Sequence, residues 1–221
     1  MPITSSDTKP ASSNAFESSA PKPYGHTRLG PMELTRWLHQ RVPDLEELWL
    51  HELRARGLGQ GPAIDRVVEM FVGQLVYMLP FLMGPYRDPI RPLWDRASEL
   101  YGAIAAKRGL AAGEAIEEVH VLRELVIRDL YRDPPHGGTV PLSLREVLRL
   151  NRALDRAVTH ASVGHTDAMF FEFFEAEGVT ALLTGDDVAV EAEAQLDLIR
   201  DAVCEVLRQG KTGPAAARRG H

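Results

Sequence analysis

Apolar residues recur three and four positions apart through most of residues 31–208, and this spacing constrains the fold more than any other feature. Side chains spaced in this way share one face of an α-helix, whereas a strand requires strict alternation. Breaks rich in glycine and proline divide the chain into five or six such segments. The sequence therefore predicts an all-α protein, a globin-like or helical-bundle domain of five to six helices with a long fifth helix.

Residues typical of helix ends place the boundaries. Pro62 suits a first helical turn, Gly109 suits the end of a helix, and Ser143 with Glu146 forms a capping box. The predicted helices are residues 31–56, with a bend at Pro43, and then 62–83, 90–107, 113–131, 143–178 and 187–208. The second is apolar over a wide arc, so we expect it at the centre of the fold.

Composition separates a central body from two tails. Residues 1–29 are rich in Ser, Ala and Pro, and residues 209–221 are similar with a basic end. Neither tail has enough apolar side chains to offset its ordering entropy, so we expect both to be disordered. Between them, residues 30–178 are predicted to form a helical domain and residues 179–208 a C-terminal amphipathic helix.

Charge and cysteine usage restrict the partners and the compartment. The formal net charge of −6 argues against a broad nucleic-acid surface, which requires clustered Lys and Arg. The most apolar run, residues 71–84, is too short to span a membrane and is interrupted by Gln74 and Pro80. The N-terminus does not resemble a signal peptide, and the single cysteine, Cys204, is typical of a reducing compartment. We expect a cytoplasmic protein without membrane insertion or nucleic-acid partners.

The sequence contains no recognisable catalytic or metal-binding motif. His160 and His165 are five residues apart, so they lie on different helix faces and do not form a two-ligand zinc turn. The glycines of GLGQGPAID lack the Lys-Ser/Thr of a phosphate-binding loop, and no serine occupies a nucleophile elbow. We therefore predict no enzyme activity, no catalytic residues, no metal site and no cofactor. Haem ligation by a lone histidine stays an alternative.

The fifth predicted helix carries a heptad-like seam, which suits a long packed or dimer-forming helix. Asn151 falls at a core position of this seam, where it either fixes register between chains or is satisfied within one chain. Four phenylalanines, Phe170, Phe171, Phe173 and Phe174, cover all sides of their helix, so some rings should face another element or another subunit. The amount of apolar surface predicts a homodimer whose interface or register residues are Asn151, Leu154, Val158, Phe170, Phe171, Phe174, Leu196 and Ile199.

Several short motifs follow one another in a particular order between residues 34 and 178. Trp37 lies in the first helix, and LRLNRALDRAV at residues 148–158 supplies Asn151, Leu154 and Asp155. The stretch of residues 101–130 holds Gly102, Arg108 and Gly109, and then Glu118, Leu122 and Arg123 in an E-x-x-x-L-R spacing. This order resembles the RsbRD N-terminal domain family.

The resemblance implies a helical, globin-like sensory module of the kind found at the front of stress-signalling regulators and histidine kinases. Such modules typically lack catalytic residues, bind no obligatory cofactor and pair as dimers. The family often has His where this chain has Tyr101, so a histidine-dependent role is not carried over to that position. No output domain fits in residues 179–221, which implies a stand-alone version. The expected function is a non-catalytic signal-sensing or adaptor module that homodimerises and contacts an unidentified signalling protein; the alternative is a globin-like haem or small-ligand sensor.

Overall fold

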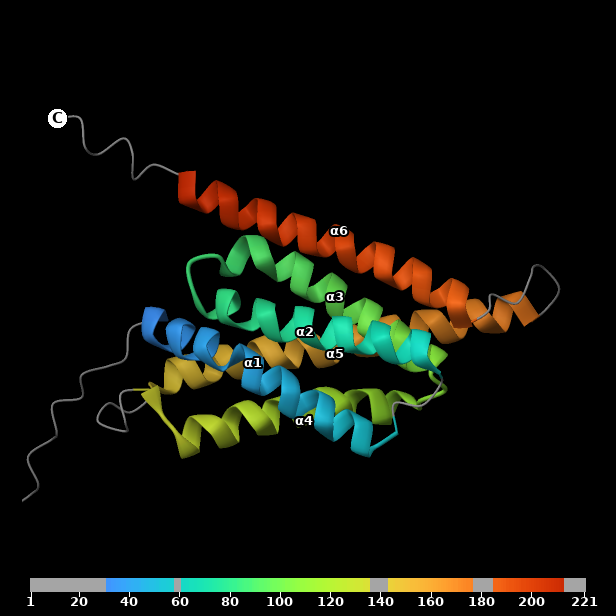
Figure 1. Cartoon of the computed structure of the whole chain (residues 1–221), viewed down its shortest axis with the longest axis horizontal. Helices are drawn as coiled ribbons and strands as arrows, with labels where there is room; N and C mark the ends of the chain where they lie inside the picture. Colours follow the sequence, from blue (N-terminus) through green and yellow to red (C-terminus); the bar gives the residue numbers. More distant parts are fainter. Residues whose placement is uncertain (1–30, 58–60, 136–142, 177–184, 213–221) are drawn as a thin grey trace, which may run out of the picture.

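The computed structural model describes residues 31–57, 61–135, 143–176 and 185–212. Six helices occupy these ranges: α1 Pro31–Ala55, α2 Pro62–Met83, α3 Arg87–Lys107, α4 Ala112–Arg132, α5 Leu144–Ala176 and α6 Gly185–Thr212. No strand occurs within them, and α5 is the longest at 33 residues, so the all-α prediction is confirmed. Figure 1 shows that α1, α3 and α5 begin at the end of the bundle where α2, α4 and α6 finish.

The helix boundaries follow the signals in the sequence, with two exceptions. Ser143 and Glu146 form the predicted capping box: the Glu146 N–H donates to Ser143 Oγ at 3.3 Å, and the Ser143 N–H donates to Glu146 Oε2 at 3.2 Å. Helix α3 begins at Arg87 rather than Ile90, because Pro89 falls in its first turn, where the missing N–H would have no helical partner. Helix α6 continues to Thr212, so residues 209–212 belong to it. The rest of both predicted tails lies outside the described residues.

Helix α2 lies at the centre of the bundle, as its wide apolar arc predicts. It contacts α1, α3, α5 and α6. Of the described helices, only α2 has the length and apolar composition needed to cross a membrane. In the fold, 72% of its most apolar 18-residue segment is buried. The sequence pattern indicates an apolar segment of residues 71–84, interrupted by Gln74 and Pro80. The structure shows that the apolar helix is longer, since it runs through both residues for 22 residues.

Helices α3 and α5 run in the same direction. Trp94 Nε1 donates to the carbonyl of Ala153 at 3.0 Å, and Glu99 Oε1 lies 2.8 Å from His160 Nδ1. The sequence separations of these two contacts, 59 and 61 residues, are nearly constant, which requires a parallel pair. Helix α4, which links α3 to α5 in the sequence, therefore runs in the opposite direction and returns the chain to the end where both helices begin.

Two glycines set the distance at which α3 and α5 cross. A Cβ on Gly102 would lie 1.9 Å from the carbonyl oxygen of Ala161, and a Cβ on Gly164 would lie 1.8 Å from that of Glu99. Neither position has room for any side chain, because the obstructing atoms are backbone. The crossing thus depends on glycine from both helices.

Helix α6 covers α2 and α3 as part of the same body. It contacts both helices, and Leu196 and Val203 are completely buried in the core that α1–α5 also share. The sequence pattern separates residues 30–178 from residues 179–208. Helix α6 belongs to the second of these parts but helps to fill the core of the first.

Candidate functional site

A charged pair is buried where α3 ends against α4. Arg108 donates from Nη1 to Glu118 Oε2 and from Nη2 to Glu118 Oε1, each at 2.8 Å, and the two side chains are 2% and 5% exposed. The Tyr101 hydroxyl donates to Glu118 Oε2 at 2.6 Å. We refer to Tyr101, Arg108 and Glu118 as the buried charge network. Trp49 of α1 completes the surroundings by donating its indole N–H to the Glu118 carbonyl at 2.9 Å.

The turn between α3 and α4 brings these side chains together. Gly109 adopts a positive φ of 75°, which glycine tolerates best. Its N–H donates to the carbonyl of Ala106 at 2.8 Å, and the Leu110 N–H donates to that of Ala105 at 3.1 Å, the pattern of a Schellman motif. The predicted glycine cap is therefore confirmed. Because this turn is tight, Glu118 lies only about two helical turns into α4 when it meets Arg108.

Burial and the mutual contacts determine the protonation of the network. Burial raises the pKa of Tyr101 well above its ordinary value, and the neighbouring charge and hydrogen bond of Glu118 raise it further. Burial lowers the pKa of Arg108, but the hydrogen bond and charge of Glu118 outweigh this effect and leave it raised. Tyr101 therefore stays protonated and donates, while Arg108 stays charged. A bidentate pair of this kind fixes the relative orientation of two helices.

Other residues of the short motifs between residues 34 and 178 also join helix to helix. Arg123 Nη2 pairs with Asp155 Oδ1 and connects α4 to α5. Trp37 of α1 donates its indole N–H to the Asp133 carbonyl, just after α4, at 2.9 Å. Leu122 is 1% exposed and lies in the core. The structure thus assigns packing and orienting contacts to Trp37, Gly102, Arg108, Gly109, Glu118, Leu122, Arg123 and Asp155.

Most of the predicted interface residues have other surroundings. Leu154, Leu196 and Ile199 are 0%, 0% and 5% exposed within a single chain, so they form its core and do not offer a subunit interface in this conformation. Asn151 and Val158 are half-buried. Phe170 is 59% exposed, and the side chains of Phe171 and Phe174 lie outside the described residues.

Asn151 lies at the margin of the buried face of α5 and not in the core. The predicted seam assumed a coiled-coil repeat of about 3.5 residues, whereas a straight helix has about 3.6 residues per turn. This difference amounts to only about 20° over the two turns before Asn151. The buried face at this level is formed by Leu150 and Leu154, to one side of Asn151, so Asn151 falls at its margin. The residues buried along α5 are Glu146, Leu150, Ala153, Leu154, Ala157, Ala161, Gly164, His165 and Ala168.

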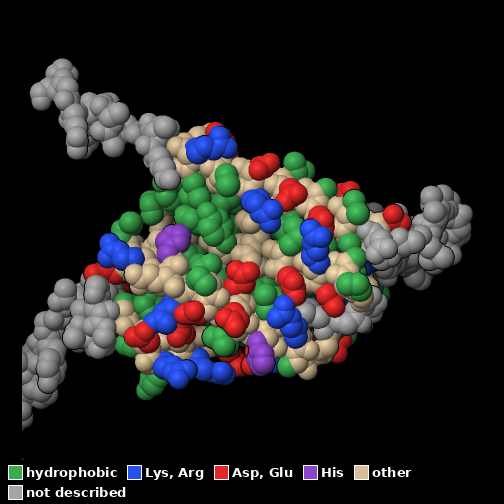
Figure 2. Space-filling view, viewed as in Figure 1, with side chains coloured by type: hydrophobic (Ala, Val, Ile, Leu, Met, Phe, Trp, Pro, Cys, Tyr) green, Lys and Arg blue, Asp and Glu red, His purple; other side chains and the backbone are tan. Residues whose placement is uncertain are grey.

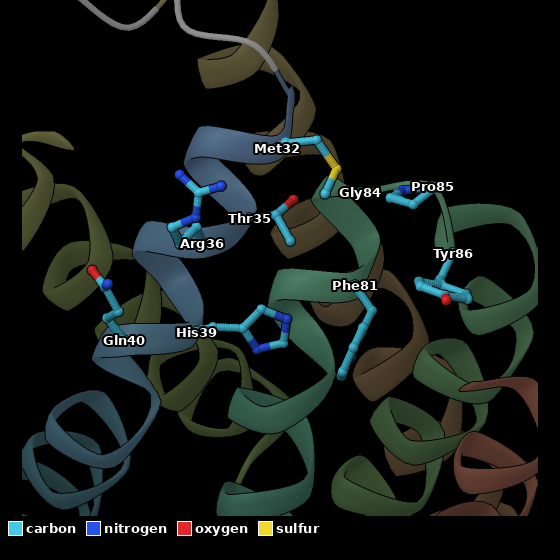
Figure 3. A pocket seen from close by; sticks show the side chains of 9 residues that line it. All are labelled: Met32, Thr35, Arg36, His39, Gln40, Phe81, Gly84, Pro85 and Tyr86. Atoms are coloured by element: carbon cyan, nitrogen blue, oxygen red, sulfur yellow. The ribbon is translucent and has the colours of Figure 1, made fainter. Parts of the chain in front are cut away.

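An apolar cavity of about 400 Å³ opens between the start of α1 and the end of α2. Figure 3 shows His39 pointing toward Phe81, with Tyr86 beyond it, whereas Gln40 points away. The rings of His39 and Phe81 meet edge to face, with centroids 4.8 Å apart. Burial lowers the pKa of His39, which favours the neutral ring. In Figure 2, hydrophobic side chains gather at this end of the molecule between α6 and a histidine.

The described histidines do not converge on a common point. His160 contacts Glu99 of α3, whereas His165 Nε2 lies 2.7 Å from the Leu110 carbonyl in the α3–α4 turn. Within the ranges that the structure covers, no three His, Cys, Asp or Glu side chains are grouped to hold a metal ion. Cys204 is an exposed free thiol on α6.

Two features of this region were missed by sequence reasoning. Tyr101 and Arg108 are seven residues apart, which places them on one face of α3, so their convergence on a shared acceptor had a sequence signal. Gly164 lies inside a long helix, and an isolated internal glycine often indicates a close backbone approach.

No known protein-family model, curated protein or solved structure matches this chain.

Proposed function

We propose that this chain is a non-catalytic signal-sensing or adaptor module that forms a homodimer and contacts a signalling partner. The observation that carries the proposal is an exposed apolar surface on α4 and α5. Ile127, Tyr131, Leu144 and Leu148 are 45%, 92%, 72% and 45% exposed, respectively. Helices α4 and α5 are in contact, and the end of α4 lies beside the start of α5 (Figure 1). We call these four residues the α4–α5 apolar surface.

Protein contact is the favourable use of such a surface. Covering apolar area is worth about 25 cal/mol per Å², and gathered exposed apolar side chains are typical of interaction sites. A two-fold axis allows one patch to serve both partners. This surface replaces the buried Leu154, Leu196 and Ile199 as the proposed interface.

The contacts of α4 supply a route by which a signal would reach this surface. The buried charge network holds α4 against α3, and the Arg123–Asp155 pair holds it against α5. A partner or ligand that favours another position of α4 must provide new contacts for these charged groups. Intermediate positions would leave the groups unpaired, so α4 should occupy discrete positions. The proposal therefore treats α4 as the element that changes position.

Sedimentation velocity tests the proposed dimer. We expect the unmodified protein to be a dimer at micromolar concentration, and Leu148→Asp to be a monomer, because an unpaired charge in a dry interface is unfavourable. Leu198→Asp is the matched control, since Leu198 is 65% exposed on α6. A monomeric wild-type protein, or dissociation by both variants alike, contradicts the proposed interface.

The same proposal places the protein in the cytoplasm, without an obligatory cofactor. A pull-down from native cells with wild-type protein and Tyr131→Asp identifies the signalling partner, which should be lost with the variant. Partners retained equally by both proteins bind elsewhere.

A small-ligand sensor is the second candidate, because the cavity beside His39 and Phe81 measures about 400 Å³. Pockets of this size and apolar character accommodate small organic ligands. The absorption spectrum of the purified protein distinguishes the haem form of this candidate. A Soret band that persists through gel filtration and disappears in His39→Ala would support it over the adaptor proposal.

A further inference from the structure

A second cavity, of about 340 Å³, lies between the first halves of α3 and α5 and is lined mainly by arginine. Its other lining residues are Leu82, Trp94 and Ala153, and no lining residue is acidic. The chain as a whole carries a formal charge of −6, so this positive concentration runs against the overall balance. We call it the arginine groove and define it by Arg87, Arg91, Arg145, Arg149, Arg152 and Arg156.

Helical spacing and the parallel helix pair explain why the arginines converge. Those of α5 are spaced four, three and four residues apart and therefore share one face. Arg87 and Arg91 are four apart on α3 and do the same. Because α3 and α5 run in the same direction, the two rows begin at the same end. Trp94 is completely buried, with its indole N–H bonded to the Ala153 carbonyl.

The neighbours of these arginines neutralise the groove only in part. Arg156 Nε donates to Asp95 Oδ1 at 2.9 Å, while Arg87 and Arg91 share Asp88 at 3.2 and 3.7 Å. Arg149 Nη1 donates to a backbone carbonyl, that of Met83, at 3.2 Å. Among the residues that the structure describes, no ion pair joins an acidic side chain to either of the remaining two, Arg145 and Arg152.

Leaving these charges together is unfavourable without a counter-charge. Like charges four residues apart on a helix repel each other, and α5 contains this spacing twice in the groove. Local rules of this kind are broken mainly at functional sites. The N-termini of α3 and α5 add positive dipole ends to the same region. An anion in the groove would relieve the repulsion.

We propose that the arginine groove binds a small anion bearing two or three linked phosphate groups. The planar guanidinium group donates two parallel hydrogen bonds to phosphate oxygens. Arginine therefore binds phosphate more specifically than lysine, whose ammonium group acts as a point charge. The groove volume of about 340 Å³ fits a ligand of that size and is too small to hold an extended polyanion such as nucleic acid. This site does not depend on dimer formation or on the α4–α5 apolar surface.

Isothermal titration calorimetry of the full chain with sodium tripolyphosphate tests the site. We expect one binding site, and a loss of affinity of about a hundredfold in Arg145→Gln/Arg152→Gln, because each removes a charge-assisted hydrogen bond. Arg200→Gln/Arg208→Gln is the control, since it removes equal charge from α6, where both arginines pair locally. The control should stay within about threefold of wild type, because distant surface charges are screened. A parallel titration with a nucleoside triphosphate shows whether an attached organic group adds affinity to the phosphates.

Three outcomes overturn the assignment. These are the absence of binding at millimolar tripolyphosphate, equal weakening in both double variants, and binding of hexaglutamate as tight as that of tripolyphosphate. The last result would favour an acidic protein segment. If circular dichroism shows that the double variant is unfolded, Arg145→Gln and Arg152→Gln are measured singly, each with an expected loss of about tenfold.

Discussion

Glu118 is the side chain on which the polar contacts of the core converge. It accepts two hydrogen bonds from Arg108 and one from Tyr101, and it is buried together with both donors. An ionised carboxylate offers about four acceptor positions, so these three donors nearly saturate it. Such a network is favourable only while it is complete, since each partner removed leaves another group buried without compensation.

Removing one partner of the network should therefore destabilise the fold more than removing both. We expect Arg108→Met to lower the free energy of unfolding by about 3–5 kcal/mol, and Tyr101→Phe to lower it by about 1 kcal/mol. The double variant Arg108→Met/Glu118→Leu should recover a large part of the first loss, because no charge then stays buried. Urea unfolding followed by circular dichroism measures all three. A double variant less stable than Arg108→Met would show that the pair itself is a net source of stability.

At the scale of elements, the α3–α5 crossing has the least tolerance for change. Gly102 and Gly164 allow the two backbones to approach, and an added methyl group at either one meets a carbonyl oxygen. Interiors are densely packed and do not yield by an ångström without a shift of whole helices. The groove, the His160–Glu99 contact and the Trp94 hydrogen bond all span this same pair of helices.

Substitution of these glycines should contrast with that of a glycine in an open position. We expect Gly164→Ala to lower the thermal unfolding midpoint by several degrees despite the higher helix propensity of alanine. Gly113→Ala is the control: nothing lies within 4 Å of its added Cβ, and the change should stabilise α4 by about 0.5–1 kcal/mol. Differential scanning calorimetry compares the two. Equal stabilisation by both would mean that α3 and α5 do not cross at Gly164.

For the whole molecule, α6 decides whether the core is complete. Helices α2 and α3 pack against it, and Ala189, Ala192, Leu196, Ile199 and Val203 bury their side chains there. An amphipathic helix isolated in water is marginal, so α6 gains its stability from this packing. We accordingly expect the described helices to unfold as one cooperative unit.

Paired substitutions on α6 test this view. Leu196→Ala should lower the free energy of unfolding by about 2–5 kcal/mol, as in other fully buried sites, in a single transition. Leu198→Ala, at an exposed position, should change it by less than about 0.5 kcal/mol. Chemical denaturation followed by two spectroscopic signals measures both. Two separate transitions, or a negligible effect of Leu196→Ala, would show that α6 is a peripheral attachment.

How much of this was predictable differs between elements and contacts. Pro62, Gly109 and the Ser143–Glu146 pair act within a few residues, so local sequence was enough to place those helix ends. Asn151 was wrongly assigned to the core because the spacing of apolar residues does not fix the centre of the buried face, which Leu150 and Leu154 form at this level. The partners of Glu118 and Arg123 were not identified, since Arg108 and Asp155 come from other segments. The arginine groove was likewise not predicted, because its two rows are about 58 residues apart and meet only in the parallel pair.

The three tryptophans provide built-in fluorescent reporters of separate contacts. Trp37, Trp49 and Trp94 are 6%, 0% and 0% exposed, so their emission should be blue-shifted in the folded chain and shift to the red when water reaches them. Trp37 reports on the end of α4, Trp49 on the buried charge network through the Tyr101 ring 5.9 Å away, and Trp94 on the arginine groove. Replacing any two of them with phenylalanine leaves a chain whose single indole reads one helix contact, without an attached dye.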